Sequence, residues 1–140
     1  MAYVVDPSVA LAWLLPDETN ARADAVRVAV ENGADAWIPV HWWLEIGNGL
    51  LMAERRRRIT AEQVDQALSL VNALPLEEDG ETAEQIPVRT LTLARKHGLT
   101  LCDAAYLELA QRRGAILATF DEQLLTAAVK EKILTELKGP

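Results

Sequence analysis

Short uncharged runs of apolar, often β-branched residues alternate along this chain with longer segments of helical periodicity. The clearest runs occupy residues 3–5, 36–40 and 115–119. Runs of this length, bounded by charged or turn-forming residues, are typical of strands buried on both faces. We expect two further short strands at residues 74–77 and 133–137, although the last run could instead extend the helix before it.

Between these runs, apolar residues recur at intervals of three and four, which predicts helices. Capping boxes begin at Thr60 and Thr82. Pro87 lies inside one of the segments, so that helix must kink or begin later. The helices are expected over residues 9–15, 21–31, 41–56, 60–73, 82–97, 100–113 and from 121 onward. Strands that alternate with helices in this way predict parallel βαβ units and an α/β fold. No repeat or linker interrupts residues 1–140, so we expect a single domain.

The segment 41–56 differs from the other helices because it has two apolar faces. Leu44 and Leu51 lie nearly opposite a face formed by Trp42, Trp43, Ile46, Leu50 and Ala53. Such a helix is either deeply buried or also meets a partner. Gly47 and Gly49 weaken this helix but permit close packing.

The chain has 21 acidic and 14 basic residues, a net charge of −7, which argues against a general nucleic-acid binder. Arg55-Arg56-Arg57-Arg58 is a basic block that fits either the solvated end of a helix or a set of phosphate contacts. No apolar run approaches the roughly 18 residues that span a bilayer, and the start lacks the basic segment of a signal peptide. The single Cys102 fits a reducing compartment. We therefore expect a cytoplasmic protein with no membrane contact.

Four acidic residues are candidates for a shared site. Asp6 ends the first strand and Asp121 follows the run 115–119, so both lie in one crevice if these strands are neighbours. Asp103 heads the apolar face of its helix, and Glu45 is flanked by apolar residues. Each acid also has an ordinary alternative: a turn for Asp6, a helix cap for Asp121, a capping box with Thr100 for Asp103, and a solvent-facing position for Glu45.

Clustered carboxylates repel one another, so a shared site implies a bound cation. All-oxygen ligands suit Mg²⁺ or Mn²⁺, whereas His41, His97 and Cys102 are too few for a typical zinc site. The chain contains no G-x-S-x-G, P-loop or G-x-G-x-x-G motif. A carboxylate-held Mg²⁺ activates water and stabilises an in-line phosphoryl displacement, and it lets an acidic protein act on an anionic substrate.

Four segments in order along the chain resemble those of the PIN domain. They are Val4-Val5-Asp6-x-Ser8, Glu45 on the second major helix, Leu99-Thr100-x-x-Asp103-Ala104-x-Tyr106 and Leu117-Ala118-Thr119-x-Asp121. Within that superfamily the chain is most similar to the VapC toxins of bacterial and archaeal toxin–antitoxin pairs. The resemblance covers nearly the whole chain. It implies a three-layer α/β/α domain with a mainly parallel five-stranded sheet.

The resemblance also implies an endoribonuclease that uses Mg²⁺, with Mn²⁺ as a substitute, a cognate antitoxin as partner, and a homodimer. It assigns the catalytic and metal-binding quartet to Asp6, Glu45, Asp103 and Asp121, and supporting hydroxyls to Ser8 and Thr119. On this hypothesis three aspartates hold the metal directly or through water, and Glu45 completes the site or orients the attacking water. Phe120 departs from the family pattern, in which a polar residue is frequent, and could alter substrate or metal support.

Arg55, Arg56, Arg57 and Arg58 are then candidates for holding the backbone of an RNA substrate, with tRNA and rRNA as the classes to test. Two alternatives remain open. One is a phosphatase with Asp6 as nucleophile, which is disfavoured because Ser8 stands where such sites carry a second acid. The other is an inactive domain that only binds a partner or RNA; the intact quartet speaks against it.

Overall fold

A four-stranded parallel sheet forms the centre of the molecule, in a computed structural model that describes residues 1–136. In sheet order, the strands are β3 (Glu77–Glu78), β2 (Asp35–Ile38), β1 (Ala2–Val5) and β4 (Ile116–Ala118). Val4 in β1 is paired with Trp37 in β2 and with Leu117 in β4. Because all the strands run in one direction, their carboxyl ends meet at one edge of the sheet.

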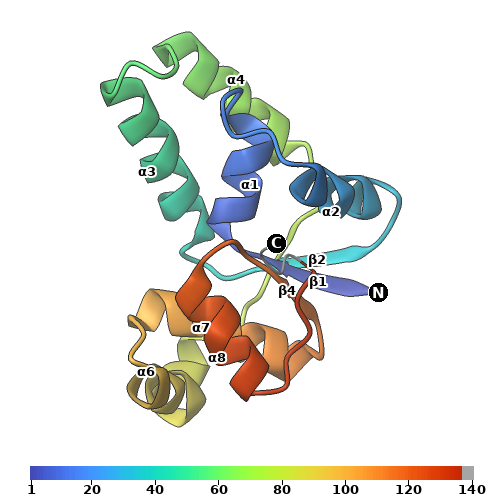
Figure 1. Ribbon diagram of the computed structural model, residues 1–140, viewed down its shortest axis with the longest axis vertical. Helices are drawn as coiled ribbons and strands as arrows, with labels where there is room; N and C mark the ends of the chain where they lie inside the picture. The colour runs from blue at the N-terminus through green and yellow to red at the C-terminus, as the bar shows by residue number, and fades with distance from the viewer. Residues whose placement is uncertain (137–140) are drawn as a thin grey trace.

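Helices cover both faces of the sheet (Figure 1). On one side lie α1 (Pro7–Leu14), α2 (Ala21–Glu31), α3 (Trp42–Arg55) and α4 (Ala61–Asn72). On the other side lie α5 (Thr82–Gln85), α6 (Leu91–His97), α7 (Leu101–Arg113) and α8 (Glu122–Lys130). The three-layer α/β/α architecture is therefore confirmed. Within residues 1–136, no helix is both long and apolar enough to cross a bilayer.

The five-strand count is wrong for the part of the chain that the structure describes. The segment predicted as the last strand contributes a single bridge, between Thr135 and Leu117, where a fifth strand would lie. The N–H of Leu117 also donates to the carbonyl of Leu134 at 2.8 Å. Residue 137, the last of that predicted strand, lies outside the described residues. The run 74–77 likewise gives only the two-residue β3, because the chain turns away after Glu78.

Pro87 breaks the regular hydrogen bonding of the predicted helix 82–97. The segment η1 (Ile86–Thr90) is a π-helical turn between α5 and α6, and the N–H of Leu91 donates to the carbonyl of Ile86. Because proline supplies no N–H, the regular hydrogen bond from residue i to i−4 is replaced here by one from residue i to i−5. The kink that the sequence predicts at this proline therefore takes the form of a π turn.

The close packing expected at the α3 glycines holds for one of them. A Cβ added at Gly49 would lie 2.7 Å from Cδ1 of Leu11, so this glycine lets α3 approach α1 closely. A Cβ added at Gly47 would meet nothing within 4 Å, so close packing does not explain that glycine. Trp42, Ile46 and Leu50 of the same helix are fully buried, which fixes this face of α3 against the core.

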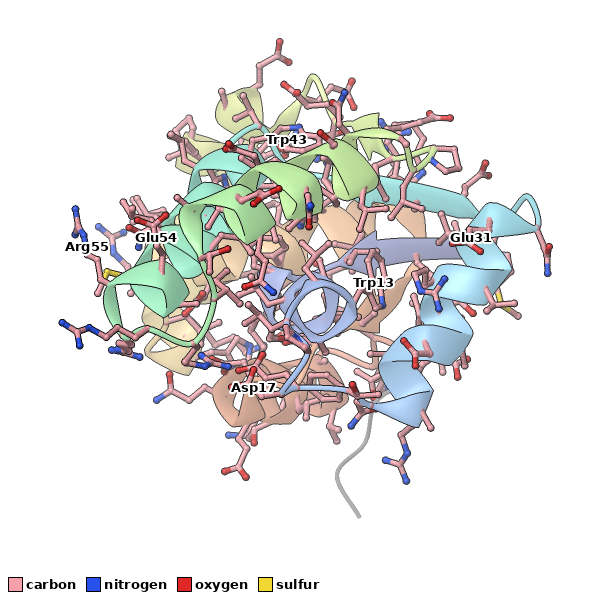
Figure 2. All side chains as sticks on the ribbon, turned by 90° about the horizontal axis from the view of Figure 1, so that it is seen from above. Trp13, Asp17, Glu31, Trp43, Glu54 and Arg55 are labelled. Carbon is pink, nitrogen blue, oxygen red and sulfur yellow. The ribbon has the colours of Figure 1, made fainter. Side chains whose placement is uncertain are left out.

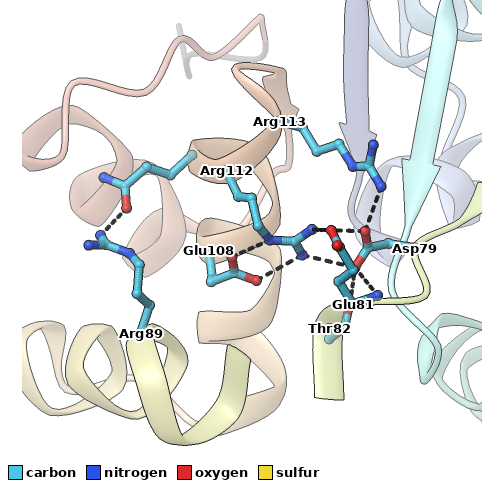
Figure 3. A network of polar contacts seen from close by, with 8 residues as sticks. Asp79, Glu81, Thr82, Arg89, Glu108, Arg112 and Arg113 are labelled. Atoms are coloured by element: carbon cyan, nitrogen blue, oxygen red, sulfur yellow. Dashed lines mark hydrogen bonds and ion pairs between the residues drawn. The ribbon is translucent and has the colours of Figure 1, made fainter. Parts of the chain in front are cut away.

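A buried ionic network joins the end of β3 to α7 (Figure 3). Asp79, 1 % exposed, accepts hydrogen bonds from the guanidinium groups of Arg112 and Arg113. Arg112 also donates to Glu108 at 2.7 and 3.1 Å. The Thr82 hydroxyl donates to Asp79 at 2.6 Å, and Thr82 lies inside α5 instead of capping it as predicted. The network stabilises the layer formed by α5 to α8 without touching the acidic quartet.

Candidate metal-dependent site at the carboxyl edge of the sheet

Asp6 lies between β1 and α1, and three donors fix one of its carboxylate oxygens. Its Oδ2 accepts hydrogen bonds from the Ser8 N–H at 3.2 Å, the Ser8 hydroxyl at 2.5 Å and the Thr119 hydroxyl at 3.0 Å. Its backbone N–H donates to the carbonyl of Ala118 at 2.9 Å, which ties this turn to the end of β4. No group within residues 1–136 donates a hydrogen bond to Oδ1, which is the oxygen left for a ligand.

Asp121 follows β4, the strand next to β1, so the turns that carry these two acids are adjacent. Its Oδ1 caps α8 by accepting the N–H of Leu124 at 2.9 Å. Its own N–H donates at 3.0 Å to the Thr119 hydroxyl, which in turn donates to Asp6. Ser8 forms a parallel bridge, since its hydroxyl accepts the N–H of Phe120 at 3.0 Å and donates to Asp6. The two hydroxyls therefore join both acid-bearing turns.

Glu45 enters the site from the first turn of α3. The Tyr106 hydroxyl donates to its Oε1 at 2.6 Å, and His41 Nε2 lies 3.2 Å from the same oxygen. The α3 helix is itself fixed near the acids, because the indole N–H of Trp42 donates to the Val5 carbonyl at 2.8 Å. Like Asp6 and Asp121, Glu45 has one oxygen bound by the protein and a second without a protein hydrogen bond among residues 1–136.

Asp103 lies in the first turn of α7. Thr100 caps this helix by accepting the Asp103 N–H at 3.2 Å, so the cap of α7 is the threonine and not the aspartate. Burial raises the pKa of the Asp103 carboxyl, and the negative charge of Asp121 raises it further, which places these two acids within electrostatic reach. The alternative interpretation of Thr100 and Asp103 as a capping box is therefore supported in part, since Thr100 accepts the Asp103 N–H.

The charged form of Asp6 is also disfavoured in the folded protein. Burial raises the pKa of Asp6 to about 6; hydrogen bonds from Ser8 and Thr119 oppose this shift, and the charge of Glu45 adds to it. Burial is the main cause of the raised pKa values of Asp6 and Asp103, and the charge of a neighbouring acid is a smaller one. A bound cation would stabilise the charged form of both carboxylates.

The donor set fits a hard divalent cation such as Mg²⁺, because all four candidate ligands are carboxylates. Within the described residues, no three Asp, Glu, His or Cys side chains form a preassembled ligand group. Mg²⁺ keeps several waters in protein sites, so carboxylates that each offer one oxygen can hold it together with water. Asp6, Glu45, Asp103 and Asp121 are the residues that would do so.

The four arginines of the basic block differ in whether they have acidic partners. Arg58 forms a forked ion pair with Asp17, with two contacts of 2.8 Å, and also contacts Glu18 at 3.0 Å. Arg55, Arg56 and Arg57 are exposed and have no acidic partner within 4.0 Å among residues 1–136. Arg55 projects outward at the far end of α3 (Figure 2). It is ten residues from Glu45, or about 15 Å along the helix.

Sequence reasoning missed two residues that contact Glu45. Tyr106 belongs to one of the PIN-like segments but carried no assigned role, and His41 was considered only as a zinc ligand. Tyr106 is 61 positions from Glu45, so only the fold brings its hydroxyl there. His41 precedes Glu45 by one helical turn, and this i, i+4 spacing is the signal that could have identified it.

A groove lies at the C-terminal end of α1, whereas Asp6 lies at the N-terminal end of this helix. It has a volume of about 390 Å³ and is lined by residues of α1, α4 and the following loops, among them Trp13, Leu15, Ile59 and Leu70. Trp13 lies between α1 and α2 (Figure 2), where its indole N–H donates to the carbonyl of Ala23 at 2.7 Å. Leu70 is 66 % exposed, so the groove presents apolar surface to solvent.

Comparison with known proteins agrees with this geometry. A family model described as the PIN domain matches residues 3–130. The protein named Ribonuclease VapC3 from Mycobacterium tuberculosis is 32% identical over 124 residues, which cover 89% of this chain and 85% of that protein. Among solved structures, VapBC2 from Rickettsia felis bound to a DNA fragment from their promoter matches with a TM-score of 0.64 and 13% identity, over 96% of this chain and 97% of that one. A toxin-antitoxin complex from Klebsiella pneumoniae matches with a TM-score of 0.55 and 18% identity, over 85% and 86%. The chain therefore belongs to the PIN domain family, in its VapC branch.

Proposed function

We propose that this protein is a Mg²⁺-dependent endoribonuclease, with Mn²⁺ as a substitute, and that it is the toxin of a toxin–antitoxin pair. The observation that carries the proposal is the arrangement of four carboxylates at the carboxyl edge of the sheet, three of which leave one oxygen without a protein partner among residues 1–136. The relative named Ribonuclease VapC3 supports RNA as the substrate class.

The residues of the site have different roles in this reaction. Asp6, Asp103 and Asp121 hold the cation directly or through water, and Ser8 and Thr119 keep the Asp6 carboxylate in one orientation. Glu45 completes the site or orients the attacking water through its second oxygen. When bound, the divalent cation activates water and stabilises the charge of an in-line displacement at phosphorus.

The test uses fluorescently labelled single-stranded RNA, tRNA and rRNA, in Mg²⁺ with and without EDTA. Wild-type protein should cut RNA internally, EDTA should abolish cutting, and Asp6→Asn should reduce it by roughly a thousandfold or more, as loss of a central catalytic group does. Asp65→Asn is the matched control, because Asp65 is exposed on α4. Undiminished cutting by folded Asp6→Asn would overturn the assignment, and trapping of a phosphorylated Asp6 would favour the phosphatase.

The groove beside α1 is where we place the antitoxin. Its apolar lining, with exposed Leu70 and half-buried Trp13, suits an amphipathic helical segment, and the Klebsiella pneumoniae structure that shares this fold is a toxin-antitoxin complex. The partner to test is the product of the neighbouring reading frame, co-expressed with this chain. Leu70→Glu should abolish co-purification. Val129→Glu, on the opposite side of the sheet and 64 % exposed, should leave it intact.

We also propose that the protein is a homodimer that uses the outer face of α3. Leu44 on this face is 80 % exposed and Leu51 is 37 % exposed, which accounts for the second apolar face of the helix. Light scattering on purified protein should give twice the chain mass. Leu44→Glu should give a folded monomer, and a monomeric wild type would contradict the proposal.

A further inference from the structure

The ring of His41 lies between the helices that carry Glu45 and Asp103. Its Nε2 is 3.2 Å from Oε1 of Glu45 and 3.3 Å from the carbonyl oxygen of Cys102, the residue directly before Asp103. The ring also packs edge-on against Tyr106, with 5.4 Å between centroids and an interplanar angle of 74°. The imidazole is thus in contact with α3 and with the first two turns of α7.

Both oxygens that face Nε2 are hydrogen-bond acceptors. A backbone carbonyl has no proton to donate, so the contact with Cys102 requires the proton of the imidazole to be on Nε2. The same N–H is within reach of Glu45 Oε1, which also accepts the Tyr106 hydroxyl at 2.6 Å. Oε1 therefore lies close to two donors, the Tyr106 hydroxyl and the N–H that His41 donates to the Cys102 carbonyl.

His41 also occupies a position that helix formation alone would fill differently. It is the N-cap residue of α3, where Ser, Thr, Asp and Asn are preferred because their side chains accept backbone N–H groups. His41 makes no capping hydrogen bond; its side chain is directed to Glu45 and Cys102 instead. A residue that departs from the N-cap preference beside a functional site indicates that its side chain has a role in that site.

We infer that His41 is a positioning residue: together with Tyr106 it fixes Oε1 of Glu45, and it ties Glu45 to the turn that carries Asp103. Glu45 is 33 % exposed, so without His41 its carboxylate would rotate about a single hydrogen bond from Tyr106. The second oxygen would then no longer face the other acids in one orientation. The kinetic part of this inference rests on the proposed endonuclease function.

Three variants separate a hydrogen-bonding role from simple space filling. His41→Ala removes the donor and should lower kcat roughly tenfold to a hundredfold, as loss of an outer-shell partner does, with KM for RNA nearly unchanged. His41→Gln should restore most of kcat, because the glutamine amide nitrogen is the same number of bonds from Cα as Nε2. His41→Asn, whose amide is one bond shorter, should not. Asn48→Ala, at an exposed position of the same helix, is the fold control.

Two further measurements show whether His41 acts through Glu45. In a Glu45→Gln background, His41→Ala should reduce kcat no further. Mn²⁺ affinity, followed by electron paramagnetic resonance without RNA, should fall in His41→Ala and recover in His41→Gln. If wild type binds Mn²⁺ but cuts no RNA, the proposed function fails while this titration still decides the inference. Wild-type kcat and Mn²⁺ affinity in His41→Ala, or a full further loss in the Glu45→Gln background, would overturn it.

Discussion

The hydroxyl of Thr119 donates to Oδ2 of Asp6 at 3.0 Å, across 113 positions of sequence. The hydroxyl oxygen of Thr119 also accepts the N–H of Asp121 at 3.0 Å, so one fully buried side chain orients two of the four acids. This contact exists because β1 and β4 are paired in register, with Val5 opposite Ala118. The relative position of the two acid-bearing turns is therefore set by the sheet and by the hydroxyl groups of Thr119 and Ser8.

Replacing Thr119 by valine should damage the site more than the fold. Valine keeps the shape of threonine but leaves the Asp121 N–H without its acceptor, which costs about 1–3 kcal/mol of unfolding free energy. Cleavage should fall by roughly tenfold to a hundredfold, the usual effect of losing an outer-shell hydrogen bond. Thr119→Ser, which keeps the hydroxyl, should retain most activity. Equal kcat values for the valine and serine variants would contradict this role.

Asp6 should make the protein less stable as the pH rises. Burial raises its folded-state pKa to about 6 from the ordinary 3.8, so the folded protein binds this proton more tightly than the unfolded chain. Stability contributed by the protonated form is complete below about pH 4 and is lost between about pH 4 and pH 6. Asp6→Asn should therefore be more stable than wild type at pH 7 without metal, by at most roughly 3 kcal/mol.

Urea unfolding of both proteins in EDTA, at pH values from 4 to 8, measures this difference directly. The gap between Asp6→Asn and wild type should grow with pH up to about pH 6 and then stay constant. Asp65→Asn, an exposed change of the same kind, should show no such gap. A variant that is less stable than wild type at every pH would show that the hydrogen bonds to Asp6 outweigh its burial.

Sequence patterns predicted the parts of this molecule that depend on local composition. The strands around Val4, Trp37 and Leu117 have continuous apolar runs, and the helices have clear periodicity and caps, as at Thr60. The placement of Asp6 and Asp121 just after two strands followed from the same runs, whereas the structure shows that those two strands are neighbours. Predicting these features requires only the spacing of apolar residues along the chain and the direction of the strands.

Other parts could not be predicted because they depend on contacts between distant segments. The partners of Glu45 and Arg58 are chosen by tertiary packing: Tyr106 is 61 positions from Glu45, and Asp17 is 41 positions from Arg58. The sequence of consecutive arginines does not distinguish residues that contact RNA from residues that pair with an acidic loop. The last predicted strand was expected to be longer than it is. In the structure this apolar segment lies beside Leu117 and pairs with it through a single bridge, at Thr135.

Asp79 should have the opposite pH dependence from Asp6. Burial raises its pKa, but hydrogen bonds from Arg112, Thr82 and Arg113 outweigh burial and hold the pKa well below the usual range. The stability it contributes is present above the ordinary carboxyl pKa of about 4 and is lost as the pH falls below it. Asp79→Asn should therefore destabilise the protein at pH 7 by about 3 kcal/mol, because it removes a buried carboxylate that pairs with Arg113 and Arg112, while Arg112 keeps Glu108.

Thermal or urea unfolding at pH 7 and pH 3 tests this difference. The wild type should exceed Asp79→Asn in stability at pH 7, and the difference should shrink at pH 3. RNA cleavage at temperatures where the variant is folded should be unchanged, since Arg112 and Arg113 lie in the last turn of α7, whereas Asp103 lies in its first turn. Equal stability of the two proteins at pH 7 would mean that the arginines find other partners.

The arginine block offers a test of RNA binding with an internal control. Arg55 and Arg56 are exposed without an acidic partner among residues 1–136, whereas Arg58 already pairs with Asp17 and Glu18. Replacing Arg55 and Arg56 by glutamine should weaken binding to single-stranded RNA and lower the slope of log Kd against log salt by about 1 for each phosphate that the protein no longer binds. Arg58→Gln should leave that slope unchanged and have little effect on stability, because the ion pair it breaks is exposed. Fluorescence anisotropy at four salt concentrations, with catalysis blocked by Asp6→Asn, gives the slopes. If Arg58→Gln lowers the slope as much as the Arg55 and Arg56 substitutions do, Arg58 leaves its acidic partners to bind RNA. If none of these substitutions alters the slope, the arginine block is only the solvated end of α3.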